Sequence, residues 1–78
     1  MKDGGAFQKR SVSLGGHRTS VSLEAAFWTE LERLAEEQTR SLASLLAEID
    51  RDRAPEQNLA SALRLHVLEA LTARRDGR

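Results

Sequence analysis

Two short stretches near the N-terminus alternate polar and apolar residues, which is typical of a strand buried on one face. The stretches are Ser11-Val12-Ser13-Leu14 and Ser20-Val21-Ser22-Leu23, and Gly15-Gly16 lies between them. Because glycine adopts positive φ without steric cost, a Gly-Gly pair in this position predicts a tight hairpin. The expected pairs are Leu14 with His17, Val12 with Thr19, and Arg10 with Val21. The pattern leaves one alternative open, in which residues 10–14 form a free basic arm.

Three later stretches repeat apolar residues at the spacing of an amphipathic helix. They run from about Glu24 to Glu37, from about Ser41 to Arg51, and from about Leu59 to Arg74. Ser41 and Asn58 stand where helix N-caps are expected. The pattern therefore predicts a mostly α protein, with one or two short N-terminal strands followed by three helices. Within it we expect a flexible lead over residues 1–9, one domain over residues 10–74 and a tail over residues 75–78.

The chain has 78 residues and no cysteine, so neither a disulfide nor a thiolate metal site can stabilise it. A chain this short buries only about 60% of its unfolded surface, which favours association with a second copy. A strand that enters a helix directly would also leave the N–H and C=O groups of its edge unpaired. The same strand of a second copy could pair with them. The third helix is apolar over a broad arc, so it is a further candidate for subunit contact, including a higher oligomer.

The formal net charge is zero, but the charge is distributed unevenly along the chain. Residues 1–20 carry four cations and one acid, residues 24–52 carry three cations and eight acids, and residues 53–78 carry five cations and three acids. A basic segment joined to an acidic body is typical of a nucleic-acid-binding arm, although the sequence pI of 6.7 is low for a DNA-binding protein. No apolar run is long enough for a membrane span or a signal peptide, so we expect a cytoplasmic protein.

The sequence contains no pattern that predicts catalysis, a metal site or a cofactor. It has no glycine-rich phosphate loop and no nucleophile motif, and a chain of this size offers little room for an active-site cleft. His17 and His66 are far apart and lack the spacing of metal ligands. We therefore expect a protein that is not an enzyme and that binds neither a metal nor a cofactor.

The segment Arg18–Leu23, the helix over Glu24–Glu37 and the turn Ala35–Ser44 together resemble the ribbon-helix-helix family of bacterial and phage regulators. The resemblance covers roughly residues 9–72. It implies an intertwined homodimer whose two strands form an antiparallel ribbon in the major groove of double-stranded DNA, and it predicts a transcription regulator, expected to be a repressor. The sequence departs from the family at Thr39, where glycine is common, and in the added upstream strand and third helix.

The resemblance assigns roles to individual residues. The residues expected to contact base edges are Arg18, Ser20 and Ser22. Those expected to contact phosphates at the start of the second helix are Arg40, Ser41 and Ser44, and Lys9 and Arg10 of the upstream strand are expected to add phosphate contacts. The expected dimer core contains Val21, Leu23, Phe27, Leu31, Leu45 and Ile49.

The upstream strand creates a conflict with this arrangement. If it pairs within its own chain, a dimer joined strand to strand has four strands, and three spacings of about 4.8 Å exceed a groove about 12 Å wide. Either the upstream strand separates from the sheet as a basic arm, or the sheet does not enter the major groove. The alternative function is a module that binds a protein partner, or a ligand-regulated scaffold, with the same fold and no reading of DNA.

Overall fold

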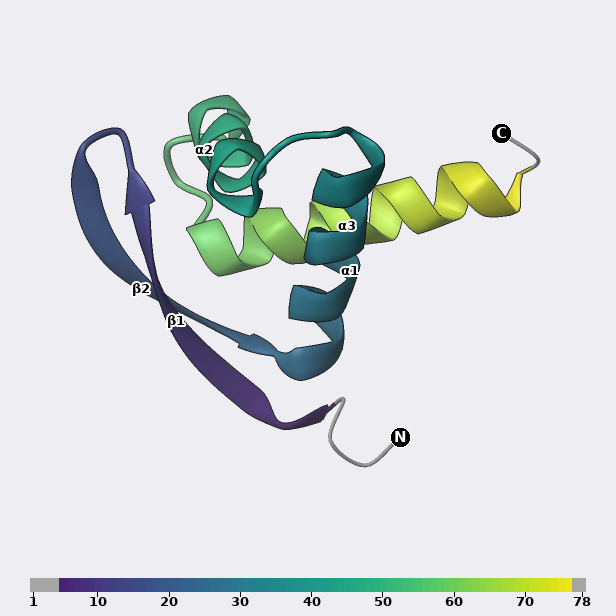
Figure 1. Cartoon of the computed structure of the whole chain (residues 1–78), viewed down its shortest axis with the longest axis horizontal. Helices are drawn as coiled ribbons and strands as arrows, with labels where there is room; N and C mark the ends of the chain where they lie inside the picture. Colours follow the sequence, from purple (N-terminus) through teal and green to yellow (C-terminus); the bar gives the residue numbers. More distant parts are fainter. Residues whose placement is uncertain (1–4, 77–78) are drawn as a thin grey trace.

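The computed structural model describes residues 5–76, and the outer parts of the expected lead and tail, residues 1–4 and 77–78, lie outside this range. A β-hairpin comes first and three helices follow (Figure 1). The elements are β1 (Phe7–Leu14), β2 (His17–Glu24), α1 (Ala25–Glu37), α2 (Leu42–Asp52) and α3 (Leu59–Arg75). This order confirms the mostly α fold that the hydrophobic pattern predicts.

The hairpin has the predicted pairing. Leu14 lies opposite His17, Val12 opposite Thr19, and the antiparallel ladder continues to Phe7 and Glu24. Gly15 and Gly16 both have positive φ, +56° and +87°, as a tight turn matched to the strand twist requires. Residues 10–14 are therefore a strand of an intrachain hairpin rather than a free arm.

β1 begins at Phe7, three residues before the expected start of the domain at residue 10. Two hydrogen bonds with residues at the start of α1 hold the N-terminal end of β1 in place. The indole Nε1 of Trp28 donates to the carbonyl oxygen of Gln8 at 2.8 Å, and the backbone N–H of Ala25 donates to the carbonyl oxygen of Ala6 at 2.8 Å. Because these bonds join β1 to α1, the strand continues past the alternating segment that the sequence reveals.

Local capping fixes the ends of the helices. The side chain of Ser41 accepts from the N–H of Ser44 at 3.0 Å, and Asn58 accepts from the N–H of Ser61 at 2.8 Å, so both predicted N-caps are confirmed. At the end of α1, Thr39 adopts φ +55°, and the N–H of Arg40 donates to the carbonyl of Ala35 at 3.0 Å. This is the Schellman geometry, in which glycine is the usual residue at the position of Thr39.

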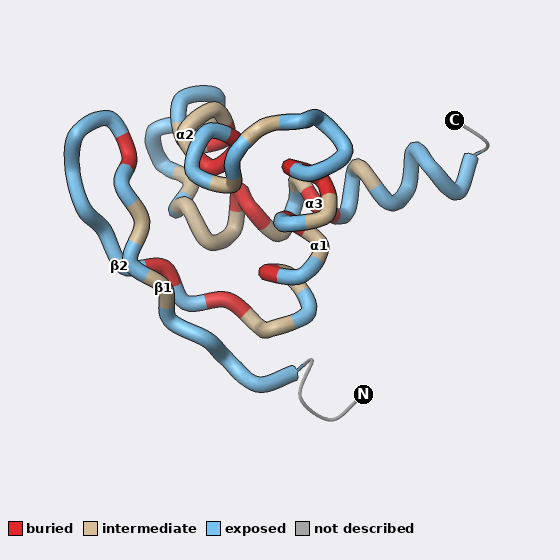
Figure 2. The backbone as a smooth tube through the Cα atoms, in the orientation of Figure 1, coloured by how far each residue is buried: buried red, intermediate tan, exposed pale blue. Residues whose placement is uncertain are grey.

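The single chain buries a core between the inner face of the hairpin and the three helices (Figure 2). Of the six residues expected in a dimer core, five are buried here within one chain, namely Val21, Leu23, Leu31, Leu45 and Ile49. Phe27 is partly buried against them. β1 pairs with one edge of β2 in the same chain, and among the described residues no strand lies beside the other edge of β2.

The last turns of α3 project from this body (Figures 1 and 2). The buried residues of α3 are Ala62, Leu63 and Val67, all in its first two thirds. Leu65, Leu68 and Leu71 remain 45%, 57% and 40% exposed, and we call these three residues the leucine strip. Within residues 5–76, none of the helices is long and apolar enough to cross a membrane.

Candidate nucleic-acid interface

The hairpin has one solvent-facing side, which we call the outer face. Strand alternation turns every second residue of β1 and β2 toward it, while Val12, Leu14, Val21 and Leu23 face the helices. All of its polar residues before Glu24 are exposed, namely Lys9, Ser11, Ser13, Arg18, Ser20 and Ser22. The three residues expected to contact bases therefore lie together on one exposed surface, and Lys9 joins them from the neighbouring strand.

Arg18 spans both strands of the outer face. Its guanidinium donates to Oγ of Ser11 at 3.1 Å and lies 3.5 Å from Oγ of Ser13, both on β1. These are neutral acceptors in water, so exchanging them for a stronger acceptor on a ligand costs little. The arginine is thus held over the strand pair and remains available to a partner.

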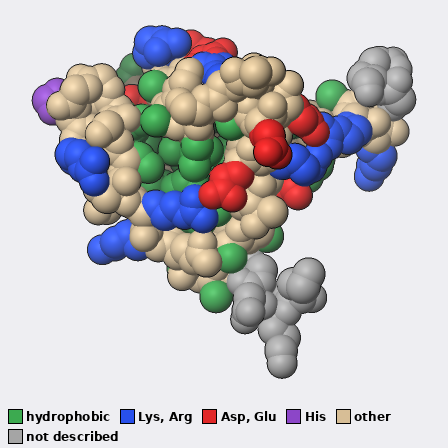
Figure 3. Space-filling view, viewed as in Figure 1, with side chains coloured by type: hydrophobic (Ala, Val, Ile, Leu, Met, Phe, Trp, Pro, Cys, Tyr) green, Lys and Arg blue, Asp and Glu red, His purple; other side chains and the backbone are tan. Residues whose placement is uncertain are grey.

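The outer face is free of negative charge over most of its length. Residues 5–23 contain no Asp or Glu, and two of their three cations, Lys9 and Arg18, lie on the outer face. In Figure 3 the acidic side chains gather over the helices, while basic side chains lie both on the hairpin side and over the helices. The cations of the outer face attract a polyanion. The carboxylates of the helices are repelled by the polyanion and favour an orientation in which they point away from it.

The outer face ends at Glu24, the first carboxylate of the hairpin. Nε of Arg64 donates to Oε1 of Glu24 at 3.0 Å, and the Arg64 guanidinium also lies 5.8 Å from the centroid of the Phe27 ring. A hydrogen bond from the backbone of Glu24 and then the bond from Arg64 lower the pKa of this carboxyl group below its ordinary value. Because Arg64 balances its charge, Glu24 repels a polyanion less than a free carboxylate would.

Arg10 lies on the opposite face, although it was expected to contact phosphate. Its guanidinium stacks 4.7 Å from the centroid of the Trp28 ring and donates to Oε2 of Glu32 at 2.6 Å. Strand alternation explains why Arg10 faces inward: adjacent residues of a strand point to opposite faces, and its neighbour Lys9 lies on the outer face. The structure therefore separates Lys9 and Arg10.

The start of α2 holds the other residues expected to contact phosphate. Arg40 turns back along the helix: its Nε donates to Oγ of Ser44 at 3.1 Å, and its Nη1 pairs with Glu48. The hydrogen bond and charge of Arg40 lower the pKa of the Glu48 carboxyl group. Ser41 uses its hydroxyl as the N-cap. The structure thus brings Arg40, Ser41 and Ser44 together, and Arg40 would have to leave Glu48 to reach a phosphate.

Two features of this surface were missed by sequence reasoning. One is the contact of Arg10 with Trp28, of which the alternation could have indicated only the inward position of Arg10. The other is the Arg64–Glu24 pair, which joins residues 40 positions apart and has no local signal in the sequence.

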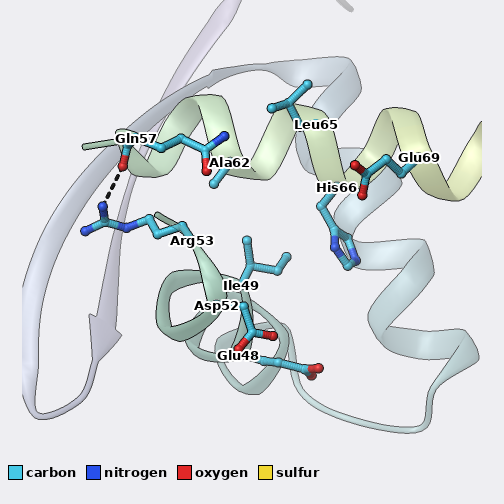
Figure 4. Close-up of a pocket in the computed structure, with 9 residues that line it drawn as sticks. All are labelled: Glu48, Ile49, Asp52, Arg53, Gln57, Ala62, Leu65, His66 and Glu69. Atoms are coloured by element: carbon cyan, nitrogen blue, oxygen red, sulfur yellow. Dashed lines mark hydrogen bonds between the residues drawn. The ribbon is translucent and has the colours of Figure 1, made fainter. Parts of the chain in front are cut away.

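A separate hollow of about 250 Å³ lies between α2 and α3 (Figure 4). Apolar side chains Ile49, Ala62 and Leu65 line it together with charged groups, and Nη1 of Arg53 donates to the carbonyl oxygen of Gln57 at 2.5 Å along one side. His66 points toward α2 in this view. Among the described residues, no group of His, Cys, Asp and Glu has the arrangement of a metal site.

Comparison with known proteins agrees with this geometry. The ribbon-helix-helix domain family matches residues 7–71, which include both strands, α1 and α2 entirely and most of α3. An uncharacterized protein from Bordetella pertussis Tohama I has a similar solved structure, with a TM-score of 0.86 and 29% sequence identity. The similarity covers 99% of this chain and 65% of the Bordetella chain, so this chain spans less than two thirds of that protein. No curated protein matches the chain. With most of its length matched, the chain belongs to the ribbon-helix-helix family, whose members are in general DNA-binding transcription regulators.

Proposed function

We propose that this protein is a sequence-specific DNA-binding regulator that acts as a homodimer and presents the outer face of its hairpin to the major groove. The observation that carries the proposal is the position of Arg18, Ser20 and Ser22. They are exposed on the strand directly before α1, on a face that carries one carboxylate, Glu24, paired with Arg64 at its end. This is the strand with which the family reads DNA.

The side chains on this face suit base edges of different kinds. The planar guanidinium of Arg18 can donate two hydrogen bonds to O6 and N7 of guanine, a contact worth about 1–3 kcal/mol of discrimination. Serine hydroxyls both donate and accept, so Ser20 and Ser22 discriminate less sharply between bases. We therefore assign most of the specificity on β2 to Arg18.

Phosphate contacts would position the protein on the duplex. The N-terminus of α2 carries Ser41 and Ser44, and helix N-termini favour anions because their N–H groups and dipole point outward. Arg40 would exchange Glu48 for phosphate, which keeps the guanidinium paired in both states. Lys9 adds a cation on the outer face itself.

The homodimer is supported by the family, whose members typically bind DNA as dimers, and by the leucine strip. Three exposed leucines follow one another at i, i+3 and i+6 along α3, from Leu65 beside the hollow between α2 and α3 to Leu71 nearer the end of the helix. We assign this surface to the contact with the second copy. Such a regulator, expected to be a repressor, would act on the chromosome in the bacterial cytoplasm.

The proposal is tested by titrating labelled duplexes with the purified protein and following fluorescence anisotropy. We expect tighter binding to a sequence selected from a random library than to a scrambled duplex, and a steep loss of affinity with salt because phosphate contacts release counterions. Arg18→Ala should reduce the preference for the selected duplex. Equal affinity for both duplexes at every salt concentration would contradict the proposal.

A second candidate function is a protein-interaction module that uses the same fold. The acidic body and the exposed leucine strip favour it, because both are surfaces that DNA would not contact. In that case α3 would bind a partner protein, and the protein would show no saturable, sequence-selective binding to DNA at low salt.

A further inference from the structure

Arg18 differs from most arginines of the molecule in the groups that hold it. Within residues 5–76, six arginines pair with carboxylates, namely Arg10, Arg33, Arg40, Arg53, Arg64 and Arg74. Arg18 instead contacts the hydroxyls of Ser11 at 3.1 Å and Ser13 at 3.5 Å. A carboxylate would neutralise the guanidinium and compete with DNA for it, whereas a hydroxyl orients the guanidinium and leaves its charge intact.

Both hydroxyls belong to β1, the strand that the chain adds upstream of β2. Ser13 lies directly opposite Arg18 in the strand register, and Ser11 lies two residues away from Ser13 on the same face of β1. These are the direct and the diagonal neighbour of a side chain that crosses from one strand to the other. The two contacts together therefore define the direction in which the Arg18 side chain extends over β1.

β1 is itself anchored to the body of the protein. Leu14 is buried in the core, and Val12, between the two serines, is partly buried against it. The indole of Trp28 donates to the carbonyl oxygen of Gln8 at 2.8 Å and holds the other end of the strand. A long side chain that is held by such a strand in advance loses less conformational entropy when a ligand immobilises it.

We infer that Ser11 and Ser13 are positioning residues that orient Arg18 for its contact with a base, so that β1 contributes to specificity through Arg18 rather than by reading bases. This inference rests on the proposed DNA binding. A guanidinium has more N–H donors than the two serines use. Arg18 can therefore keep both serine contacts while it donates to O6 and N7 of guanine.

This role of β1 leaves the ribbon to β2. β1 covers one edge of β2, and the other edge, which has no strand beside it among the described residues, is open to the β2 strand of a second copy, as the family resemblance implies. A strand that acts through Arg18 does not need to reach base edges, so β1 can lie at the rim of the groove. Only the two β2 strands, about 4.8 Å apart, then have to enter a groove about 12 Å wide.

A double-mutant cycle tests the inference. The alanine pair is Ser11→Ala with Ser13→Ala, measured both alone and together with Arg18→Ala. The matched control is the threonine pair, Ser11→Thr with Ser13→Thr, which keeps both hydroxyls. Fluorescence anisotropy gives the affinity of each variant for the duplex that the wild-type protein selects, and for the same duplex changed at the base pair where Arg18→Ala loses its preference. Thermal unfolding by circular dichroism checks that each variant folds, which we expect because both serines are exposed.

We expect the alanine pair to lower the ratio of the two affinities roughly threefold, through weaker binding to the selected duplex, and the threonine pair to keep the wild-type ratio. When Arg18→Ala is present, the alanine pair should change neither affinity further, because the residue that it positions is gone. The dependence of affinity on salt should stay as in the wild-type protein, because serine carries no charge to pair with phosphate.

An unchanged ratio in the alanine pair would overturn the inference. So would a loss of the same size in the presence of Arg18→Ala, since the serines would then contact DNA without Arg18. Equal weakening of both duplexes would also contradict it, because the serines would then support the fold or general DNA affinity. A wild-type protein without preference for any duplex would contradict the proposed function itself, and the inference would fail with it.

Discussion

The guanidinium of Arg10 lies 4.7 Å from the centroid of the Trp28 ring and pairs with Glu32 on the inner side of the hairpin. Its neighbour Lys9 lies on the outer face and is exposed. Two adjacent cations thus serve different purposes: Arg10 holds β1 against α1, and Lys9 remains available to a polyanion.

This relationship predicts that Arg10→Ala destabilises the fold by about 1 kcal/mol, the combined contribution of a stacked cation and a partly exposed ion pair. Lys9→Ala should leave stability within about 0.5 kcal/mol of wild type, as expected for an exposed position. Urea unfolding followed by the fluorescence of Trp28, the single tryptophan of the chain, measures both. Equal stabilities of the two variants would mean that the stacking of Arg10 contributes nothing to the fold.

Thr39 predicts a stabilising substitution. It is the non-glycine residue with positive φ in the described part of the chain, and its β-branched side chain strains that conformation. Thr39→Gly should raise the free energy of unfolding by about 0.5–1 kcal/mol, after allowance for the greater entropy of glycine in the unfolded chain. Thr29→Gly, on the exposed side of α1, is the control and should lower stability. A loss of stability in Thr39→Gly would contradict the Schellman assignment.

Glu24 predicts a dependence of stability on acid pH. Its pKa is lowered in the folded protein, first by its own backbone and then by Arg64, from an ordinary value of 4.5. A depressed carboxyl pKa contributes stability above the unfolded value and loses that contribution as the pH falls through the folded value. We therefore expect stability to fall as the pH drops below about 4.5, and to fall less steeply in Glu24→Gln.

Urea unfolding at a series of pH values checks this expectation, with Glu56→Gln as the control. Glu56 is an exposed carboxylate between α2 and α3, and its replacement removes the same negative charge from the surface. Arg40 lowers the pKa of Glu48, so Glu48 also contributes to the fall of the wild-type unfolding free energy at acid pH. Identical pH profiles for Glu24→Gln and wild type would show that the lowered pKa of Glu24 contributes nothing to stability.

Much of the fold follows from short-range patterns. The alternation and the Gly-Gly turn predict the register of the hairpin, and Ser41 and Asn58 predict the starts of α2 and α3, because strand pleats, tight turns and caps depend on a few neighbouring residues. The extension of β1 to Phe7 has no such signal. It depends on bonds from Trp28 and Ala25, which belong to another element.

The candidate site was predictable only in part. The alternation groups Arg18, Ser20 and Ser22 on one exposed face, but their role in base contact comes from the family resemblance. The partners of the cations could not be foreseen, since Arg10–Glu32 and Arg40–Glu48 depend on how side chains from separate turns or elements meet. The predicted hairpin places β1 on one edge of β2 within the chain, as the structure has it, but no local pattern shows what covers the other edge.

The leucine strip predicts the surface of the proposed dimer. In sedimentation equilibrium we expect the wild-type protein to have twice the mass of the 8.7 kDa chain, and Leu68→Glu to have the mass of one chain. Ala73→Glu is the matched control, because it adds the same charge at an exposed residue about 140° away around α3. A dimeric Leu68→Glu would place the interface elsewhere, and a monomeric wild type at high concentration would contradict the dimer itself.

The central claim is that the exposed hairpin reads a DNA sequence, and selection from a random duplex library tests it most directly. The wild-type protein and Arg18→Ala are carried through the same rounds of selection at roughly 100 mM salt, where nonspecific phosphate binding is weakened. We predict that the wild-type protein enriches a short inverted repeat and that Arg18→Ala enriches it weakly or not at all. Failure of the folded wild-type protein to enrich any sequence would contradict the account.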